Sequence, residues 1–368
     1  MTPRRFTLLA VAGVAVIALA LWVSQLRHLE RTVDAGQAVL PGLAGTLNTV
    51  AEVHLTKGDG THTTLKKSSS EWLVGERGFP ADSGQVRKLL IDLSELKVVE
   101  QKTREPGNYP QIGVEDVNSP KAGGTQIELV SSGQPLKLIL GRPSGSKSCF
   151  VRLAGEPQSL LATPQLTADA DPRRWLDRDV LDLPQSRVKE VALQPHAGPA
   201  YLITRASAQQ ADFSVPNLPK GRELASLSAA NPQAGVLTAL QLDDVRKSSS
   251  PPTDAEHAKF TTFDGLTLEL TGYKDGDRRI VAIKAQSGAK DSAAEAQRLT
   301  SRFSGWDLEI PSYKYDQLFK PLEELLKKPP EPAKKAVKGT AATKGAAGPK
   351  APLMSPIPAA PAAAPASK

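Results

Sequence analysis

The sequence repeats a strand pattern at an interval of 138 residues, and this repeat constrains the fold more than any other feature. Val50–Leu55 and Val188–Leu193 carry valine, glutamate, valine and leucine at matching positions, and each leads into a turn that contains glycine. A second strand and a third strand with an aromatic residue follow in both copies, with Trp72 in the first and Phe213 in the second. A period of this length is typical of a duplicated domain rather than of a solenoid.

Each copy is predicted to combine one helix with an antiparallel sheet. Asp82 is expected to cap a helix over residues 82–96, whose apolar residues fall on one face, and residues 232–242 are the expected counterpart. Alternating apolar residues predict the strands that follow, over residues 126–129, 136–140 and 149–153, then 266–270, 280–283 and 306–310. The predicted fold class is α+β: two tandem similar units, over residues 49–185 and 186–328.

The N-terminus contains a continuous apolar segment. Phe6–Val23 are 18 residues without a charge, and a helix of that length covers roughly 27 Å of a hydrocarbon core about 30 Å thick. Arg4 and Arg5 favour a cytoplasmic N-terminus over residues 1–5, a transmembrane anchor over 6–26 and an external stalk over 27–48. The expected anchor residues are Phe6, Leu8, Leu9, Val14, Ile17, Leu21, Trp22 and Val23. A cleavable signal peptide is the alternative, because Ala18–Ala20 has the form of a cleavage site.

The positive charge lies at the two ends of the chain. The formal net charge is +7, but residues 331–368 contain six lysines and one acid, and two arginines precede the apolar segment. The remaining body is neutral, which disfavours nucleic acid as a partner because phosphate neutralisation supplies much of that affinity. Residues 329–368 are rich in alanine, proline and lysine, and we expect this tail to be disordered.

A segment between the two copies is predicted to form their junction. It contains a tryptophan and leucines that we expect to be buried in the seam. The junction residues are Trp175, Leu176, Asp177 and Leu181. Nearby acids with interspersed arginines favour local ion pairs over a calcium loop, which would need glycine and glutamate at fixed positions.

No motif predicts catalysis, a cofactor or a metal. Gly141–Ser148 approaches a phosphate-binding loop but lacks the glycine before Lys147, and the alternating strand after it favours a hairpin. His54 and His62 lack a third ligand, and Cys149 shares strand parity with apolar neighbours. Tyr313 and Tyr315 beside Pro311 could stack on a glycan, although packing in the core is the commoner role.

Several motifs together resemble the bacterial family called domain of unknown function 4340. They lie between residues 48 and 328: Glu71–Val74, Phe79–Asp82, Tyr109–Val114, Phe150–Leu153, Arg174–Asp179 and Thr262–Leu266. The resemblance implies a membrane-anchored envelope protein, encoded in some relatives near ABC-type transport components, and it brings no established catalytic residue.

These observations predict a non-enzymatic, membrane-anchored accessory or scaffold protein of a bacterial envelope complex. The expected location is the inner membrane, with a single span and the body in the periplasm. The expected partners are the bilayer and a membrane protein, either a transporter permease or an envelope component. The alternative is a periplasmic glycan- or lipid-binding module that uses the cleft between the two units.

Overall fold

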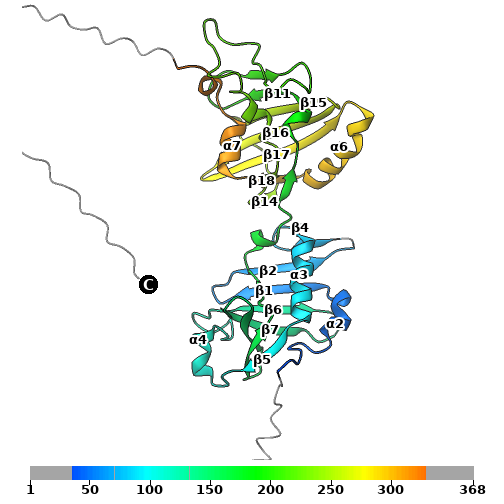
Figure 1. Ribbon diagram of the computed structural model, residues 1–368, viewed down its shortest axis with the longest axis vertical. Helices are drawn as coiled ribbons and strands as arrows, with labels where there is room; N and C mark the ends of the chain where they lie inside the picture. The colour runs from blue at the N-terminus through cyan, green and yellow to red at the C-terminus, as the bar shows by residue number, and fades with distance from the viewer. Residues whose placement is uncertain (1–34, 70, 132, 329–368) are drawn as a thin grey trace, which may run out of the picture. The chain divides into compact units, whose positions relative to one another are not determined.

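The computed structural model describes residues 35–69, 71–131 and 133–328, and the described residues as far as Lys327 form one compact unit. Two antiparallel sheets, one of nine strands and one of seven, dominate this unit (Figure 1). A two-stranded ribbon pairs β10 (Asp179–Leu181) with β13 (Leu240–Gln241).

The first sheet has the strand order β4-β3-β2-β1-β6-β7-β8-β9-β5. Its strands are β1 (Glu52–Lys57), β2 (His62–Lys67), β3 (Trp72–Val74), β4 (Phe79–Pro80), β5 (Lys97–Gln101), β6 (Thr125–Val130), β7 (Leu136–Ser144), β8 (Ser148–Leu153) and β9 (Ser159–Thr163). The helical segments around it are α2 (Leu43–Thr46), η1 (Leu47–Thr49), α3 (Ser83–Ser94), η2 (Pro106–Asn108), α4 (Tyr109–Ile112) and η3 (Pro172–Trp175).

Helix α3 confirms the predicted cap and apolar face. The Asp82 side chain accepts a hydrogen bond from the Gln85 backbone N–H at 3.0 Å. Val86, Leu89 and Leu93 lie on the buried side of the helix, which crosses one face of the first sheet in Figure 1. The cap satisfies a backbone donor that the first turn leaves free, so the helix begins where the sequence predicted.

The second sheet has the order β12-β11-β15-β16-β17-β18-β14. Its strands are β11 (Val188–Gln194), β12 (Tyr201–Thr204), β14 (Asp244–Lys247), β15 (Glu256–Thr262), β16 (Leu266–Asp275), β17 (Arg278–Ser287) and β18 (Trp306–Glu309). The helical segments around it are η4 (Gln185–Arg187), α5 (Asn231–Ala234), α6 (Lys290–Phe303), α7 (Ser312–Leu318) and η5 (Leu322–Leu325).

The two sheets share a strand order that follows the sequence repeat. The repeated segments become β1 and β11, each paired with the next strand on one side and with the first strand of a meander on the other. In both sheets one strand precedes the meander in sequence yet pairs with the last strand at the far edge: β5 with β9, and β14 with β18. The unit bounds at residues 185 and 186 stay a prediction.

The predicted helix over residues 232–242 is wrong. Helix α5 spans only Asn231–Ala234 and ends before Gly235, and Ala239 has a left-handed φ of 47° that a continuing helix would not allow. The apolar residues Val236 and Leu237 are buried nonetheless, because the irregular chain packs them into the core. A helix of 14 residues, α6, forms instead between β17 and β18.

The α+β prediction is also wrong, because the described chain is mostly antiparallel sheet with few helices. Within it only α3, with 12 residues, and α6, with 14, are longer than the seven residues of α7. No helix in residues 35–69, 71–131 and 133–328 is long and apolar enough to cross a membrane, and this finding corrects the predicted single-pass inner-membrane location. The predicted anchor residues and the tail from residue 329 lie outside the described residues.

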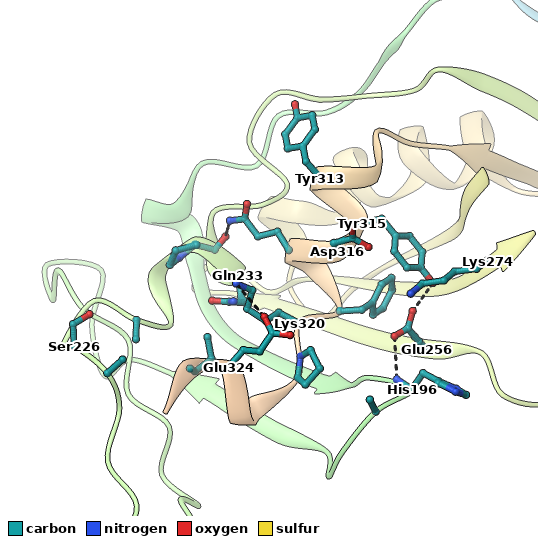
Figure 2. Close-up of a pocket in the computed structure, with 18 residues that line it drawn as sticks. His196, Ser226, Gln233, Glu256, Lys274, Tyr313, Tyr315, Asp316, Lys320 and Glu324 are labelled. Atoms are coloured by element: carbon teal, nitrogen blue, oxygen red, sulfur yellow. Dashed lines mark hydrogen bonds and ion pairs between the residues drawn. The ribbon is translucent and has the colours of Figure 1, made fainter. Parts of the chain in front are cut away.

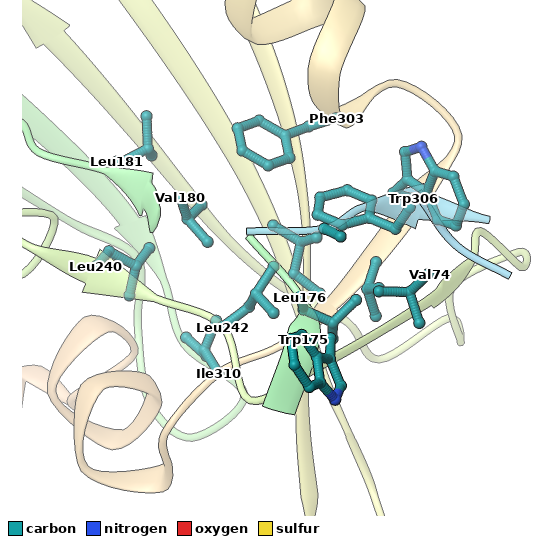
Figure 3. Packing of buried hydrophobic residues seen from close by; sticks show 14 of the residues in the cluster. Val74, Trp175, Leu176, Val180, Leu181, Leu240, Leu242, Phe303, Trp306 and Ile310 are labelled. Carbon is teal, nitrogen blue, oxygen red and sulfur yellow. The ribbon is translucent and has the colours of Figure 1, made fainter. Parts of the chain in front are cut away.

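Buried apolar side chains from both sheets belong to one contiguous cluster. Figure 3 shows part of it around Trp175, Leu176 and Trp306. Phe79 and Trp306 meet edge to face, with ring centroids 5.2 Å apart. Such contacts add to the free energy that apolar burial supplies.

Candidate functional site

A cavity of about 890 Å³ lies beside the second sheet, where α7, η5 and the turn around α5 approach β15 and β16. Ligand sites in proteins span about 300–1,000 Å³, so this volume is sufficient for a small molecule of substantial size. Figure 2 shows the residues that line it, with Glu256, Lys274 and Tyr315 close together at one side.

Two aromatic rings, Tyr315 and Phe319, form part of the cavity wall and pack on Gly272. The rings lie 4.8 Å apart between centroids. A Cβ at Gly272 would overlap the Phe319 ring and approach the Tyr315 ring to 3.0 Å. Glycine at this position of β16 therefore allows α7 and the segment after it to lie close to the sheet.

Glu256 is a buried carboxylate at the inner end of the cavity. It begins β15 directly opposite Gly272, and it is 7% exposed. Its Oε1 accepts from the His196 backbone N–H at 3.0 Å, and its Oε2 accepts from the Tyr315 hydroxyl (Figure 2). Burial and this hydrogen bond raise the pKa of Tyr315, so the phenol stays protonated and donates.

Gln233 is a buried polar side chain of the cavity that lacks a full set of partners. It is 1% exposed, and its Oε1 has no hydrogen-bond donor within the described residues. Leaving a buried amide oxygen unsatisfied costs about 1–3 kcal/mol. A donor brought by a ligand would remove this penalty, and it reaches the buried oxygen when the Gln233 side chain turns toward the cavity.

The backbone around Gln233 is held in place by α7. Lys314 Nζ donates to the Val236 and Thr238 carbonyl oxygens at 2.9 and 2.8 Å, and Gln317 Nε2 donates to the Pro232 oxygen at 2.6 Å. Burial lowers the pKa of Lys314. These bonds fix Gln233 relative to the aromatic wall, and a site built on such contacts needs little rearrangement to bind.

Charges of both signs surround the cavity. Lys274 and Lys320 are its cations, and Glu256, Asp316 and Glu324 are its acids. Lys320 Nζ lies 3.6 Å from a Glu324 carboxylate oxygen, so part of this charge is already balanced. The lining therefore offers acceptors and donors without an excess of positive charge.

Comparison with known proteins identifies a family. The sequence profile described as "Domain of unknown function (DUF4340)" matches residues 72–262, which is more than half of the 368 residues. The chain belongs to the DUF4340 family. No curated protein and no solved structure matches it. Gln233 and Glu256 lie inside the region that matches the DUF4340 profile, whereas α7 lies beyond it.

The four predicted junction residues of this DUF4340 chain lie outside the cavity. Trp175 and Leu176 are 3% and 1% exposed, and the Trp175 indole N–H donates to the Asp169 oxygen at 2.6 Å. Asp177 pairs with Arg302 at 2.9 Å through its carboxylate. Leu181 is buried opposite Leu240 in the two-stranded ribbon. The expectation that the four form a junction stays a prediction.

The structure also places the other motifs that were considered from the sequence. Ser144 and Ser148 pair across a tight turn between β7 and β8, so the hairpin prediction for this segment is confirmed. Cys149 is buried, and burial raises its pKa. Among the described residues, no group of three or more histidine, cysteine, aspartate or glutamate side chains could hold a metal ion.

Sequence reasoning singled out the two tyrosines of α7 but missed Gln233, Glu256 and Lys274. Tyr315 is 1% exposed and belongs to the core, whereas Tyr313 is 66% exposed at the cavity. The missed residues lie in the sequence among ordinary polar residues, and strand pairing and the packing of α7 bring them together. No signal in the sequence around Pro232 sets Gln233 apart, since Asn231 and Thr238 are polar as well.

Proposed function

We propose that this DUF4340 protein is a non-enzymatic binding module whose cavity, beside α7, takes a neutral, hydroxyl-rich ligand of the glycan type. The observation that carries the proposal is the buried Gln233 side chain, whose amide oxygen lacks a donor among the described residues. A glycan hydroxyl supplies such a donor and can accept a hydrogen bond in turn.

The charges of the cavity support a neutral ligand. Two lysines face three acids, so an anionic headgroup or phosphate would meet at least as much repulsion as attraction. The lining mixes apolar side chains, such as Phe319 and Leu325, with carboxylate, amide, ammonium and imidazole groups, and this mixture suits the apolar face and the hydroxyls of a sugar better than a continuous lipid chain. Both features favour a glycan over a lipid.

Tyr313 supports the same ligand class. Its ring is 66% exposed and lies on the α7 side of the cavity. It is separate from the buried Tyr315–Glu256 pair (Figure 2). An exposed aromatic ring can stack on the C–H face of a sugar while hydroxyls bond to polar groups nearby. This position is beside the second sheet rather than in a cleft between two units.

The carboxylates of the cavity favour binding over catalysis, because each already has a partner: Asp316 lies 3.8 Å from Arg279 Nε and Glu324 lies 3.6 Å from Lys320 Nζ. Both Glu256 oxygens already accept hydrogen bonds, one from the His196 backbone N–H and one from the Tyr315 hydroxyl. Glycoside hydrolysis uses two carboxyl groups free to act as acid and as base or nucleophile. We therefore assign Glu256 to positioning the aromatic wall.

The test is glycan binding by the purified chain and by Gln233→Leu. We expect specific neutral glycans of an immobilised panel to bind the wild type, and Gln233→Leu to weaken binding at least about tenfold, because a hydrogen-bond acceptor is lost. Gln286→Leu makes the same chemical change at an exposed position of β17 and should bind like the wild type. Binding to no glycan, or equal binding by Gln233→Leu, would overturn the proposal.

The accessory or scaffold role in a transport complex stays a prediction. Six large apolar side chains are exposed in the described chain, and they are spread over different elements: Ile91, Val99, Leu136, Leu227, Phe263 and Tyr313. Scattered exposed side chains are normal for a soluble surface, so we do not build a docking role on them.

A further inference from the structure

A second, smaller cavity adjoins the candidate glycan site. It measures about 140 Å³ and shares His196, Glu256, Lys274 and Tyr315 with the larger cavity. Four shared residues make the two cavities neighbours across one wall. A ligand long enough to pass the Tyr315–Glu256 pair would reach from the larger cavity into the smaller one.

The smaller cavity has its own polar lining. Asp254 contributes a carboxylate that the larger cavity lacks, 3.9 Å from His196 Nδ1. The Asp254 side chain is 66% exposed, so it keeps acceptor capacity for an incoming group. At about 30 Å³ per water molecule, this cavity holds roughly four or five waters. That is room for one small sugar unit or for the edge of a sugar ring.

We propose that the two cavities bind two linked units of one oligosaccharide, and that Asp254 selects a hydrogen-bond-donating group on the second unit. The proposal rests on the proposed glycan-binding function and deepens it. Asp254 and Glu256 outnumber the one lysine of the smaller cavity, so a hydroxyl or amino group fits there and a carboxylate does not. Because the first unit already fixes the ligand, the second bond forms at a high effective concentration.

The experiment is calorimetric titration with two series: glucose and N-acetylglucosamine, each with its linear oligomers of two to four units. We expect affinity in at least one series to rise about tenfold or more from one unit to two and then level off, since a hydrogen bond to a charged group supplies a gain of this order. Asp254→Ala should remove the gain, so that the dimer binds no more tightly than the monomer. Asp277→Ala, an exposed position in the turn after β16, is the matched control and should keep the gain.

The outcomes separate this inference from the function on which it rests. A wild type that binds the monomer as tightly as the dimer, or an Asp254→Ala variant that keeps the gain, overturns the bipartite site and leaves glycan binding standing. Failure of every sugar in both series and of the immobilised panel overturns both. The unfolding temperature of each variant is compared with that of the wild type. An unchanged value shows that the loss of the affinity gain does not come from unfolding of the variant.

Discussion

The Tyr315 hydroxyl donates to Glu256 Oε2, and both side chains are buried. Tyr315→Phe leaves that carboxylate oxygen without this donor, so we expect the free energy of unfolding to fall by about 1–3 kcal/mol. Urea denaturation followed by tryptophan fluorescence measures the change. Tyr313→Phe removes a hydroxyl from an exposed ring and should leave stability as it is; equal losses in both variants would contradict a special role for the Tyr315 bond.

Gly272→Ala should destabilise the second sheet by about 1–3 kcal/mol, because the added methyl overlaps the Phe319 ring and the neighbours must shift. Differential scanning calorimetry would report a lower unfolding temperature. Gly45→Ala is the control, since no heavy atom lies within 4 Å of its added Cβ. Shortening the ring with Phe319→Leu in the Gly272→Ala background should recover part of the loss, and no recovery would mean that another contact is responsible.

Arg187 joins η4 to α6 through Glu295 and to the turn between β15 and β16 through Asp264. Its guanidinium lies 2.6 Å from Asp264 and 2.7 Å from Glu295, and the hydrogen bond to Glu295 raises the pKa of Arg187. Arg187→Lys keeps the charge but loses the forked geometry, so we expect about 1 kcal/mol less stability. A double-mutant cycle with Glu295→Gln should show that the two side chains are coupled, whereas additive effects would rule out a specific pair.

Glu309 should make stability depend on pH. Burial and the nearby Asp244 and Asp243 raise its pKa, and Arg278 and Arg173 only partly oppose this. The folded state then holds the proton more tightly than the unfolded state, so this group lowers stability as the pH rises from the unfolded pKa through the raised folded value. Glu309→Gln should therefore be slightly more stable than the wild type at pH 7, and the difference should vanish at strongly acidic pH.

Chemical denaturation of the wild type and Glu309→Gln at several pH values between 3 and 8 measures this difference. Glu269→Gln changes a carboxylate on β16 and serves as the control. A stability difference between Glu309→Gln and the wild type that grows toward acidic pH would have the opposite sign to the one expected.

Local patterns predicted most of the strands, because each strand carries its own alternation, but the expected third strand at Phe213 is only an isolated bridge between Thr204 and Ser214. The expected strands over residues 266–270 and 280–283 lie within β16 and β17, and the Asp82 cap begins α3 as its side-chain chemistry requires. Helix α6 was not predicted, because small residues occupy much of its buried face. Ser292, Ala296, Leu299 and Phe303 are its buried positions, and two of them carry no large apolar group.

The candidate site could not be predicted in the same way. Glu256 lies opposite Gly272 only because β15 and β16 pair in that register, and Gln233 joins them only through the bonds from α7. The amide oxygen that carries the functional proposal is defined by the absence of a nearby donor among the described residues. No local pattern records such an absence, since it depends on every segment that packs around the side chain.

The edge strands β5 and β14 carry a consequence for synthesis of the chain. Each precedes the meander that it completes and pairs with the last strand of that meander, although β5 also makes backbone hydrogen bonds to residues 36–39 on its other edge. During translation, β14 emerges from the ribosome well before β18 and must wait, unpaired at this edge, until Glu309 has left the exit tunnel. The second sheet is thus completed in one late step, and a chain arrested between β17 and β18 would leave the hydrogen-bonding edges of β14 and β17 exposed.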